Sequence, residues 1–355
     1  MPPHAPHPAS CPQVRRLAAA HVAGYSCAMS DLPHGASSPA AHETASRPAR
    51  EAPRPRLEAL HLLVTYRCTF ACDHCFVWGS PQQEGTMTLA QLCDVIDQAA
   101  AAGCSTVYFE GGEPLLVYPV VLAAARHARE AGLAVGVVTN CFWAESLDDA
   151  LVWLAPFAGL GVADLSLSSY AYFTEELAQE THLRNAVVAA RQLDLPVAVL
   201  EVGAPAALAD LDVACGTPGA IMYKGRASEA LARGERLTRP PDTLTSCPYE
   251  DFADPGRCHV GCDGNLMPCQ GISIGNVWQR PLADILAAYD PATLSVVSEI
   301  AGGGPWALAR AAGLEPMRAL YADECHLCYE LRSRLRAAGR YLHVLAPEQC
   351  YGVDK

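Results

Sequence analysis

Residues 57–75 read LEALHLLVTYRCTFACDHC, a short apolar run followed at once by three cysteines. Within this run Leu60, Leu62, Leu63 and Val64 give the nearly continuous apolar pattern of a strand that is covered on both faces in a parallel sheet. The cysteines therefore lie in the loop that follows a strand. In α/β folds this edge of the sheet is where ligands bind.

Strand and helix patterns alternate after this loop. We expect strands over 105–109, 134–139, 164–168, 196–201 and 219–223, and helices over 88–102, 119–131, 146–159 and 175–193. Five or six β-α repeats predict a parallel sheet with helical crossovers. Because a closed eight-stranded barrel takes about 250 residues, the fold class that we expect is α/β with a partial (β/α)6 barrel, or an open doubly wound sheet.

Composition divides the chain into four parts. Residues 1–56 are rich in Pro, Ala, His, Ser and Arg without an apolar period, and we expect a disordered N-terminal extension there. Residues 57–225 form the expected partial barrel and 226–246 a charged, proline-containing connector. Residues 247–355 form the expected small, cysteine-rich α+β domain.

The overall composition limits the classes of partner. The net charge of −13 over 355 residues argues against a broad nucleic-acid interface, and no apolar run reaches the length of about 18 to 20 residues that spans a bilayer. Arg15-Arg16 and the apolar segment after it faintly resemble a signal peptide, but His21 interrupts the segment. We therefore expect a cytoplasmic protein that binds no membrane, whose 16 cysteines serve as reduced, metal-binding thiols.

The first cysteines have the spacing Cys68-x3-Cys72-x2-Cys75. Three thiolates in an eight-residue loop can hold three irons of a cubane 4Fe-4S cluster, and the missing fourth cysteine leaves one iron open. A zinc site is a poorer match, because zinc sites usually combine paired Cys-x2-Cys elements into four ligands.

This loop resembles the signature of the radical S-adenosylmethionine (SAM) superfamily, although His74 stands where the family usually has another aromatic residue before the third cysteine. The resemblance implies that SAM binds the open iron through its amino and carboxylate groups, with His74 beside the cofactor. One electron then cleaves SAM to methionine and a 5'-deoxyadenosyl radical, which takes a hydrogen atom from the substrate.

Polar motifs follow the next strands. Gly111-Gly112-Glu113-Pro114 resembles the Gly-Gly-Glu-Pro motif of the family and implies that Glu113 binds the SAM amino group. Thr139 and Asn140 stand where the family often places polar residues that face the cofactor.

Two further strand ends carry candidate residues. Ser166 and Ser168 share one face of their strand by alternation, and by resemblance one of them hydrogen-bonds the SAM ribose; the alternative is a pair of satisfied polar groups at a strand end. Glu201 ends the fifth expected strand and is our candidate catalytic residue, as a substrate ligand or proton acceptor. The alternative for Glu201 is an exposed carboxylate at a strand end.

The C-terminal cysteines surround a predicted β-hairpin at residues 258–270 with an Asp263-Gly264 turn. This pattern resembles the twitch or SPASM extensions of radical SAM enzymes, which carry auxiliary clusters. The resemblance implies that four thiolates hold an auxiliary 4Fe-4S cluster; they are Cys247, Cys269, Cys325 and Cys328. Two alternatives remain open, namely zinc on the same four thiolates and a second auxiliary cluster that uses Cys258, Cys262 and Cys350.

The resemblance identifies the radical initiator better than the substrate. We expect a radical SAM oxidoreductase or maturase that oxidatively modifies a peptide or protein, with a dehydrogenase or mutase of a small molecule as the alternative. The reducing partner would be a flavodoxin or ferredoxin. An iron-sulfur electron carrier is the competing class, but a carrier needs neither an open iron nor the amino-binding carboxylate of Glu113.

Overall fold

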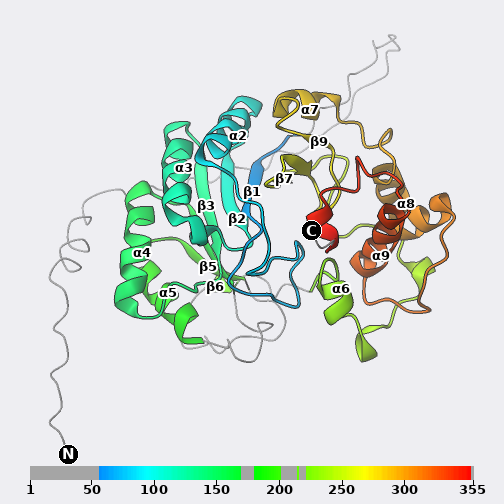
Figure 1. Ribbon diagram of the computed structural model, residues 1–355, viewed down its shortest axis with the longest axis horizontal. Coiled ribbons are helices and arrows are strands. Elements are labelled where there is room, and N and C mark those ends of the chain that lie inside the picture. The colour runs from blue at the N-terminus through cyan, green and yellow to red at the C-terminus, as the bar shows by residue number, and fades with distance from the viewer. Residues whose placement is uncertain (1–55, 169–179, 201–213, 216–220, 353–355) are drawn as a thin grey trace, which may run out of the picture. The chain divides into compact units, whose positions relative to one another are not determined.

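The first strand of the chain is an internal strand of the sheet. The computed structural model describes residues 56–168, 180–200, 214–215 and 221–352 (Figure 1). Strand β1 (Ala59–Thr65) pairs in parallel with β2 (Thr106–Gly111) on one side and with β7 (Arg257–Val260) on the other. The C-terminal part of the chain thus continues the sheet of the N-terminal part.

The sheet is open in the described residues and has the order β6-β5-β4-β3-β2-β1-β7-β8-β9. Strands β1 to β6 are all parallel, and the hairpin of β7 and β8 is antiparallel, as is the pairing of β8 with β9. The remaining bounds are β3 (Ala134–Thr139), β4 (Asp164–Ser168), β5 (Val197–Leu200), β6 (Ala214–Cys215), β8 (Asn265–Met267) and β9 (Gly275–Asn276). Six parallel strands in an open sheet confirm the predicted partial barrel.

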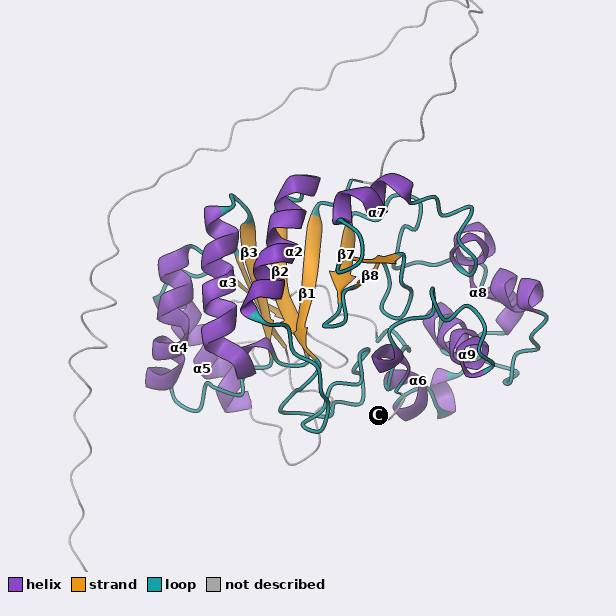
Figure 2. Ribbon diagram, turned by 45° about the horizontal axis from the view of Figure 1, so that its top comes forward, coloured by secondary structure: helices purple, strands orange, loops and turns teal. Residues whose placement is uncertain are grey.

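Four helices cover one face of the parallel strands (Figures 1 and 2). Local sequence fixes their ends: Thr88 and Gln91 form a capping box at the start of the first helix, and Gly103 ends it in the left-handed conformation. At the start of the third helix, the side chain of Ser146 accepts a hydrogen bond from the backbone of Asp149. The helices are α2 (Leu89–Ala102), α3 (Tyr118–Glu130), α4 (Leu147–Leu160) and α5 (Glu180–Gln192).

Alternation along β1 separates two environments. Leu60, Leu62 and Val64 are fully buried in the core beneath the helices. His61 and Leu63 point to the opposite, inner face of the curved sheet, because successive side chains of a strand alternate. The sheet thus has an apolar outer face, and its inner face carries polar groups.

One predicted strand was wrong in its position. The segment 219–223 was expected to be the sixth strand, but the described residues 221–223 form a loop and β6 lies earlier, at Ala214–Cys215. An apolar run beside a Gly-rich segment does not by itself fix a strand. Glu201 and the N-terminal segment 1–55 lie outside the described residues, as do residues 175–179 of the fourth predicted helix.

The C-terminal part consists of the predicted hairpin and a group of helices. Gly264 takes a left-handed φ of 82° in the turn between β7 and β8, which is the role expected of Asp263-Gly264. The helices are α6 (Ala227–Ala230), α7 (Leu282–Ala288), α8 (Val297–Ala312) and α9 (Glu324–Ala337), with short 3-10 turns at Pro114–Val117, Gly234–Arg236, Pro241–Thr243 and Glu348–Tyr351. In the described part of the chain, no helix has both the length and the apolar character that crossing a bilayer requires.

Candidate functional site

The first cysteine loop follows β1 at the carboxyl edge of the sheet. Cys68 and Cys72 are buried, and Cys75 is half-buried. Burial raises the pKa of the Cys68 thiol to about 12, and the charge of the neighbouring Glu113 carboxylate is the second cause of this rise. Burial also raises the pKa of Cys72, and the charges of the other two cysteines add to this effect. The three sulfurs are therefore close enough to repel as thiolates, so the thiolate form requires a cation among them.

Two nitrogen donors are directed at these sulfurs. The backbone N–H of Gly79 donates to Cys75 Sγ at 3.1 Å, and Asn140 Nδ2 donates to Cys68 Sγ at 3.5 Å. Hydrogen bonds to sulfur are one means by which proteins tune thiolate-bound iron. This donor set fits an iron-sulfur cluster on the three cysteines.

Arg226 contacts the cysteine loop from a segment about 150 residues later in the chain. Its Nη1 donates to the carbonyl of Cys72 at 2.6 Å and its Nη2 to the carbonyl of Gly79 at 3.0 Å. The guanidinium also lies over the Trp78 ring, 5.3 Å from its centroid. A planar fork that bridges two carbonyls positions the backbone of the loop.

Gly111 and Gly112 allow the loop after β2 to pack against the start of the cysteine loop. A Cβ atom on Gly112 would lie 2.2 Å from the carbonyl oxygen of Arg67, and one on Gly111 would lie 2.4 Å from that of Thr65. The backbone N–H of Gly112 donates to Thr65 O at 2.6 Å. These glycines therefore allow backbone to approach backbone beside the cysteine loop.

Glu113 is fully buried at this junction, just before Pro114, which begins a 3-10 turn. Its Oε1 accepts from the Leu115 backbone and the Thr139 hydroxyl, both at 2.9 Å, and its Oε2 accepts from the backbone of Asn140 at 2.8 Å. Burial outweighs these hydrogen bonds and raises the pKa of Glu113 to about 7. Thr139 and Asn140 thus fix the carboxylate, and Asn140 also reaches Cys68.

The other predicted site residues within the described chain lie in the cysteine loop and on β4. His74 is partly exposed within the cysteine loop, and burial of its ring lowers its pKa to about 4. Ser166 is buried on β4 and donates to Asp164 at 3.2 Å, while Ser168 ends the same strand half-buried. Ser166 therefore has a partner of its own inside the sheet.

The four C-terminal cysteines expected to act together line one cavity. Two come from the first turn of α9, and the other two come from residue 247 and from just after the hairpin; they are Cys247, Cys269, Cys325 and Cys328. Apolar side chains complete the wall, among them Phe252 and Ile272. Such a wall limits access of water to whatever the cysteines bind.

Two buried cations accompany this cysteine cavity. Lys224 is 2% exposed, and its Nζ lies 3.8 Å from Cys269 Sγ and 4.0 Å from Glu250 Oε1. Burial alone lowers the pKa of Lys224, but Cys269, Cys325 and Glu250 outweigh it and raise the pKa. Arg332 is 1% exposed, lines the cavity and donates to the backbone carbonyl of Gln270. Sequence patterns did not predict that either cation lies beside the cysteines. The position of Lys224, two residues before Arg226, was the one signal that could have pointed to it.

The remaining C-terminal cysteines, Cys258, Cys262 and Cys350, do not line this cavity. Cys258 lies in the core beneath the helices, near Cys104. Cys262 and Cys350 pack around Tyr66 on the other side of the sheet. Because the strand places Cys258 away from Cys262, the second auxiliary cluster considered above gains no support.

One protein-family model matches the part of the chain that carries the first cysteine loop. Residues 62–180 match the model of the radical SAM superfamily. Residues 62–180 thus form a domain of the radical SAM superfamily. The match contains the cysteine loop, the Gly111-Gly112-Glu113 segment and Asn140, which the fold brings together.

Two curated relatives match over short segments. A tungsten-containing aldehyde ferredoxin oxidoreductase cofactor-modifying protein of Pyrococcus furiosus is 31% identical over 86 residues, 24% of each chain. A PqqA peptide cyclase of Streptomyces rochei is 34% identical over 81 residues, 22% of this chain and 21% of the relative. The chain spans less than a quarter of the length of these relatives in the matched segments.

Solved structures resemble the chain more distantly. That of native anSMEcpe with bound AdoMet and Cp18Cys peptide has 13% identity and a TM-score of 0.44, covering 78% of this chain and 95% of that one. That of BtrN in complex with AdoMet and 2-DOIA has 15% identity and a TM-score of 0.42, covering 69% and 85%.

Membership of the radical SAM superfamily assigns the cofactors of the first site. A 4Fe-4S cluster and SAM fit the residues present, since three convergent cysteines, two donors to sulfur and a buried carboxylate lie at one edge of the sheet. The site is thus that of a radical SAM enzyme.

Proposed function

We propose that the protein is a radical SAM oxidoreductase or maturase that oxidatively modifies a peptide or protein. With SAM and the cluster bound, the site supplies a 5'-deoxyadenosyl radical that takes a hydrogen atom from the substrate. The observation that carries the proposal is the joining of the cysteine loop to the buried Glu113 through Asn140. This arrangement supports an open iron beside an acceptor for the SAM amino group.

In this proposal Cys68, Cys72 and Cys75 hold the cluster, and Asn140 and Gly79 direct hydrogen bonds to its sulfurs. Glu113 accepts from the SAM amino group through the lone pairs that its three intramolecular donors leave. Ser166 or Ser168 contacts the SAM ribose. Glu201 acts on the substrate.

The C-terminal cavity supports an auxiliary 4Fe-4S cluster on its four cysteines. Four thiolates outweigh the positive charge of a cluster core, and the buried Lys224 and Arg332 offset the excess. Zinc would draw four thiolates to about 3.8 Å from one another. Among the described residues, no three cysteine sulfurs all lie within 4.8 Å of one another. This wider spacing favours a cluster, whose thiolates bind different irons.

A peptide substrate is supported by the PqqA peptide cyclase among the relatives. The cofactor-modifying relative supports the second candidate, a dehydrogenase or mutase of a small molecule. In either case a flavodoxin or ferredoxin would supply the electron in the cytoplasm.

Metal analysis of the full chain after anaerobic reconstitution tests these assignments. We expect about eight irons per chain, as two 4Fe-4S clusters require. Cys325→Ala should remove roughly half of the iron and leave SAM cleavage by the first cluster. Cys93→Ala is the matched control, because Cys93 is a partly buried cysteine on α2 outside both sites. An unchanged iron content in Cys325→Ala would remove the auxiliary cluster from the proposal.

A further inference from the structure

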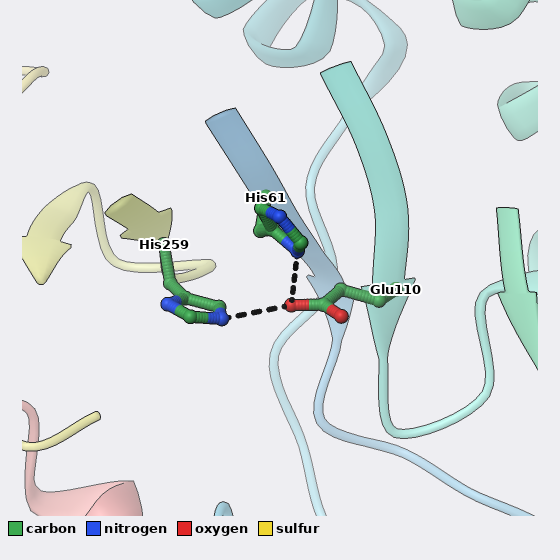
Figure 3. Close-up of side chains that lie close together, drawn as sticks. All are labelled: His61, Glu110 and His259. Carbon is green, nitrogen blue, oxygen red and sulfur yellow. Dashed lines mark ion pairs between the residues drawn. The ribbon is translucent and has the colours of Figure 1, made fainter. Parts of the chain in front are cut away.

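The inner face of the sheet holds a second group of ligand-type side chains, separate from both sets of cysteines. His61 lies on β1, Glu110 on β2 and His259 on β7, and Figure 3 shows both imidazoles directed at the same carboxylate oxygen. In the described part of the chain, this is the one group of three His, Cys, Asp or Glu side chains whose ligand atoms all lie within 4.8 Å of one another.

The parallel pairing of β1 with both neighbours creates this group. His61 is opposite His259 in the β1–β7 register, and Leu63 is opposite Glu110 in the β1–β2 register. All three side chains therefore stand on the same face of adjacent strands. They are 14%, 12% and 5% exposed in the order His61, Glu110 and His259.

The distances match those between ligands of one metal ion. Glu110 Oε1 lies 3.4 Å from His61 Nδ1 and 3.2 Å from His259 Nε2. Two ligands bound tetrahedrally to zinc at their usual bond lengths stand about 3.3 Å apart. The two imidazole nitrogens lie within 4.8 Å of each other.

Two of these atoms are buried without satisfaction. His61 Nδ1 and Glu110 Oε1 are inaccessible to solvent and make no hydrogen bond with any described residue. Buried polar atoms without partners are uncommon in native folds and mark ions or functional roles. Both atoms point to the centre of the group.

The surroundings of His259 indicate that Nε2 is its unprotonated ring nitrogen. Lys224 Nζ can only donate, and it donates to Gln270 Oε1 at 2.5 Å, so the NH2 group of Gln270 faces His259 Nε2 at 2.9 Å. An Nε2 that faces a donor carries a lone pair. His259 Nε2 and Glu110 Oε1 are then two acceptors 3.2 Å apart. A cation bound between them would take the Nε2 lone pair in place of the Gln270 N–H.

The surroundings of His61 hold its ring in place. The ring stacks on Tyr108 with centroids 4.5 Å apart and planes at 12°. The Tyr108 hydroxyl donates to Asp164 at 3.0 Å. Gly136 leaves room for the Tyr108 ring, because a Cβ at Gly136 would lie 2.3 Å from that ring. Outer partners that orient ligands are a common part of metal sites.

We propose that His61, Glu110 and His259 bind one divalent transition-metal ion, either zinc or ferrous iron. Two imidazoles and one carboxylate suit both ions. Three protein ligands leave at least one coordination position for water or for an oxygen or nitrogen donor of a substrate. The proposal does not depend on the radical reaction.

The test measures metal in the full-length protein after anaerobic reconstitution of its clusters. One portion is equilibrated with Zn²⁺ and another with ⁵⁷Fe²⁺, and each is then desalted. We expect one zinc per chain, with zinc K-edge absorption giving nitrogen and oxygen ligands at about 2.0–2.1 Å rather than sulfur at about 2.3 Å. If iron is the occupant, Mössbauer spectra show a high-spin ferrous site in addition to the clusters.

Variants then assign the ligands. His259→Ala and Glu110→Gln should each lose the additional metal, while cluster iron and sulfide stay unchanged. His127→Ala is the matched control, since His127 pairs with Asp97 at 2.7 Å on the helical face without a third ligand. Metal bound through sulfur alone, or no metal beyond the clusters in the unsubstituted protein, would overturn the proposal; in the latter case a shared proton joins Glu110 to His259. The wild-type spectra decide even if a variant does not fold.

Discussion

Lys224 Nζ lies 3.8 Å from the Sγ atom of Cys269, and the same Lys224 lies over the ring of Phe76, next to Cys75. Two residues later, Arg226 donates to the carbonyl of Cys72. The short segment 224–226 therefore contacts both cysteine sites. Gly225 makes this possible with a φ of 60°, because a Cβ there would lie 2.5 Å from Cys75 O.

Removal of the Lys224 charge should make the auxiliary cluster harder to reduce. A buried cation near Cys269 stabilises the added electron, so Lys224→Met should lower the midpoint potential of that cluster by roughly 60 mV or more, tenfold in a one-electron equilibrium constant. Redox titration followed by electron paramagnetic resonance measures this shift. Lys224→Arg keeps the charge and serves as the control. Equal potentials in Lys224→Met and wild type would show that Lys224 does not act on a cluster.

Loss of the Arg226 fork should loosen the first cysteine loop. Lysine keeps the charge but cannot bridge the carbonyls of Cys72 and Gly79 as a planar guanidinium does. We therefore expect Arg226→Lys to lose much of the iron of the first cluster and most of the 5'-deoxyadenosine formed. Arg233→Lys is the control, because Arg233 contacts only its own turn at Ala230 O. Full iron content in Arg226→Lys would argue against the positioning role.

SAM binding should strengthen as the pH rises through about 7. Burial raises the pKa of Glu113 to about 7, so the carboxylate is mostly protonated below that pH and ionised above it. Only the ionised form has all its lone pairs for the SAM amino group. Equilibrium binding at pH values of about 6 and 8 should show tighter binding at the higher value.

The variant Glu113→Gln isolates this effect. It should bind SAM weakly at both pH values while keeping its cluster iron, because Glu113 is not a cluster ligand. A pH dependence that survives in Glu113→Gln would assign the titration to another group.

The close approach at Gly112 should tolerate no side chain. A Cβ 2.2 Å from Arg67 O forces the two loops apart, so Gly112→Ala should destabilise the fold by about 1–3 kcal/mol or more. Gly159→Ala is the control, since no atom lies within 4 Å of a Cβ there and α4 continues past it. Alanine in a helix should raise stability by about 0.5–1 kcal/mol. Thermal unfolding compares the two, and equal transitions would contradict the packing argument.

Local spacing singled out the first cysteine loop and the Cys-x2-Cys pair of α9, whereas the full set of four C-terminal thiolates rests on the resemblance. Cys68, Cys72 and Cys75 occupy one loop, and Cys325 and Cys328 occupy one helical turn, so short-range patterns describe them. Short apolar runs likewise indicated most strands, and the turn at Gly264 fixed the hairpin. Only the sixth strand was misplaced.

Contacts between distant segments escaped prediction. Pairing of β1 with β7 brings His61 beside His259, nearly two hundred residues away, and no periodic pattern records that register. For the same reason Lys224 and Arg332 gave no sign that they would flank cysteines. The donors to Glu113 come from the next strand end, where Thr139 and Asn140 were expected to face the cofactor instead.

The most direct test of the account is 5'-deoxyadenosine release from SAM by the reconstituted, dithionite-reduced full-length chain. We predict that the wild-type protein and the Cys93→Ala control form 5'-deoxyadenosine, whereas Cys68→Ala, Cys72→Ala and Cys75→Ala form none. A wild-type protein that assembles its clusters, binds SAM and yet releases no 5'-deoxyadenosine would contradict the proposed radical chemistry.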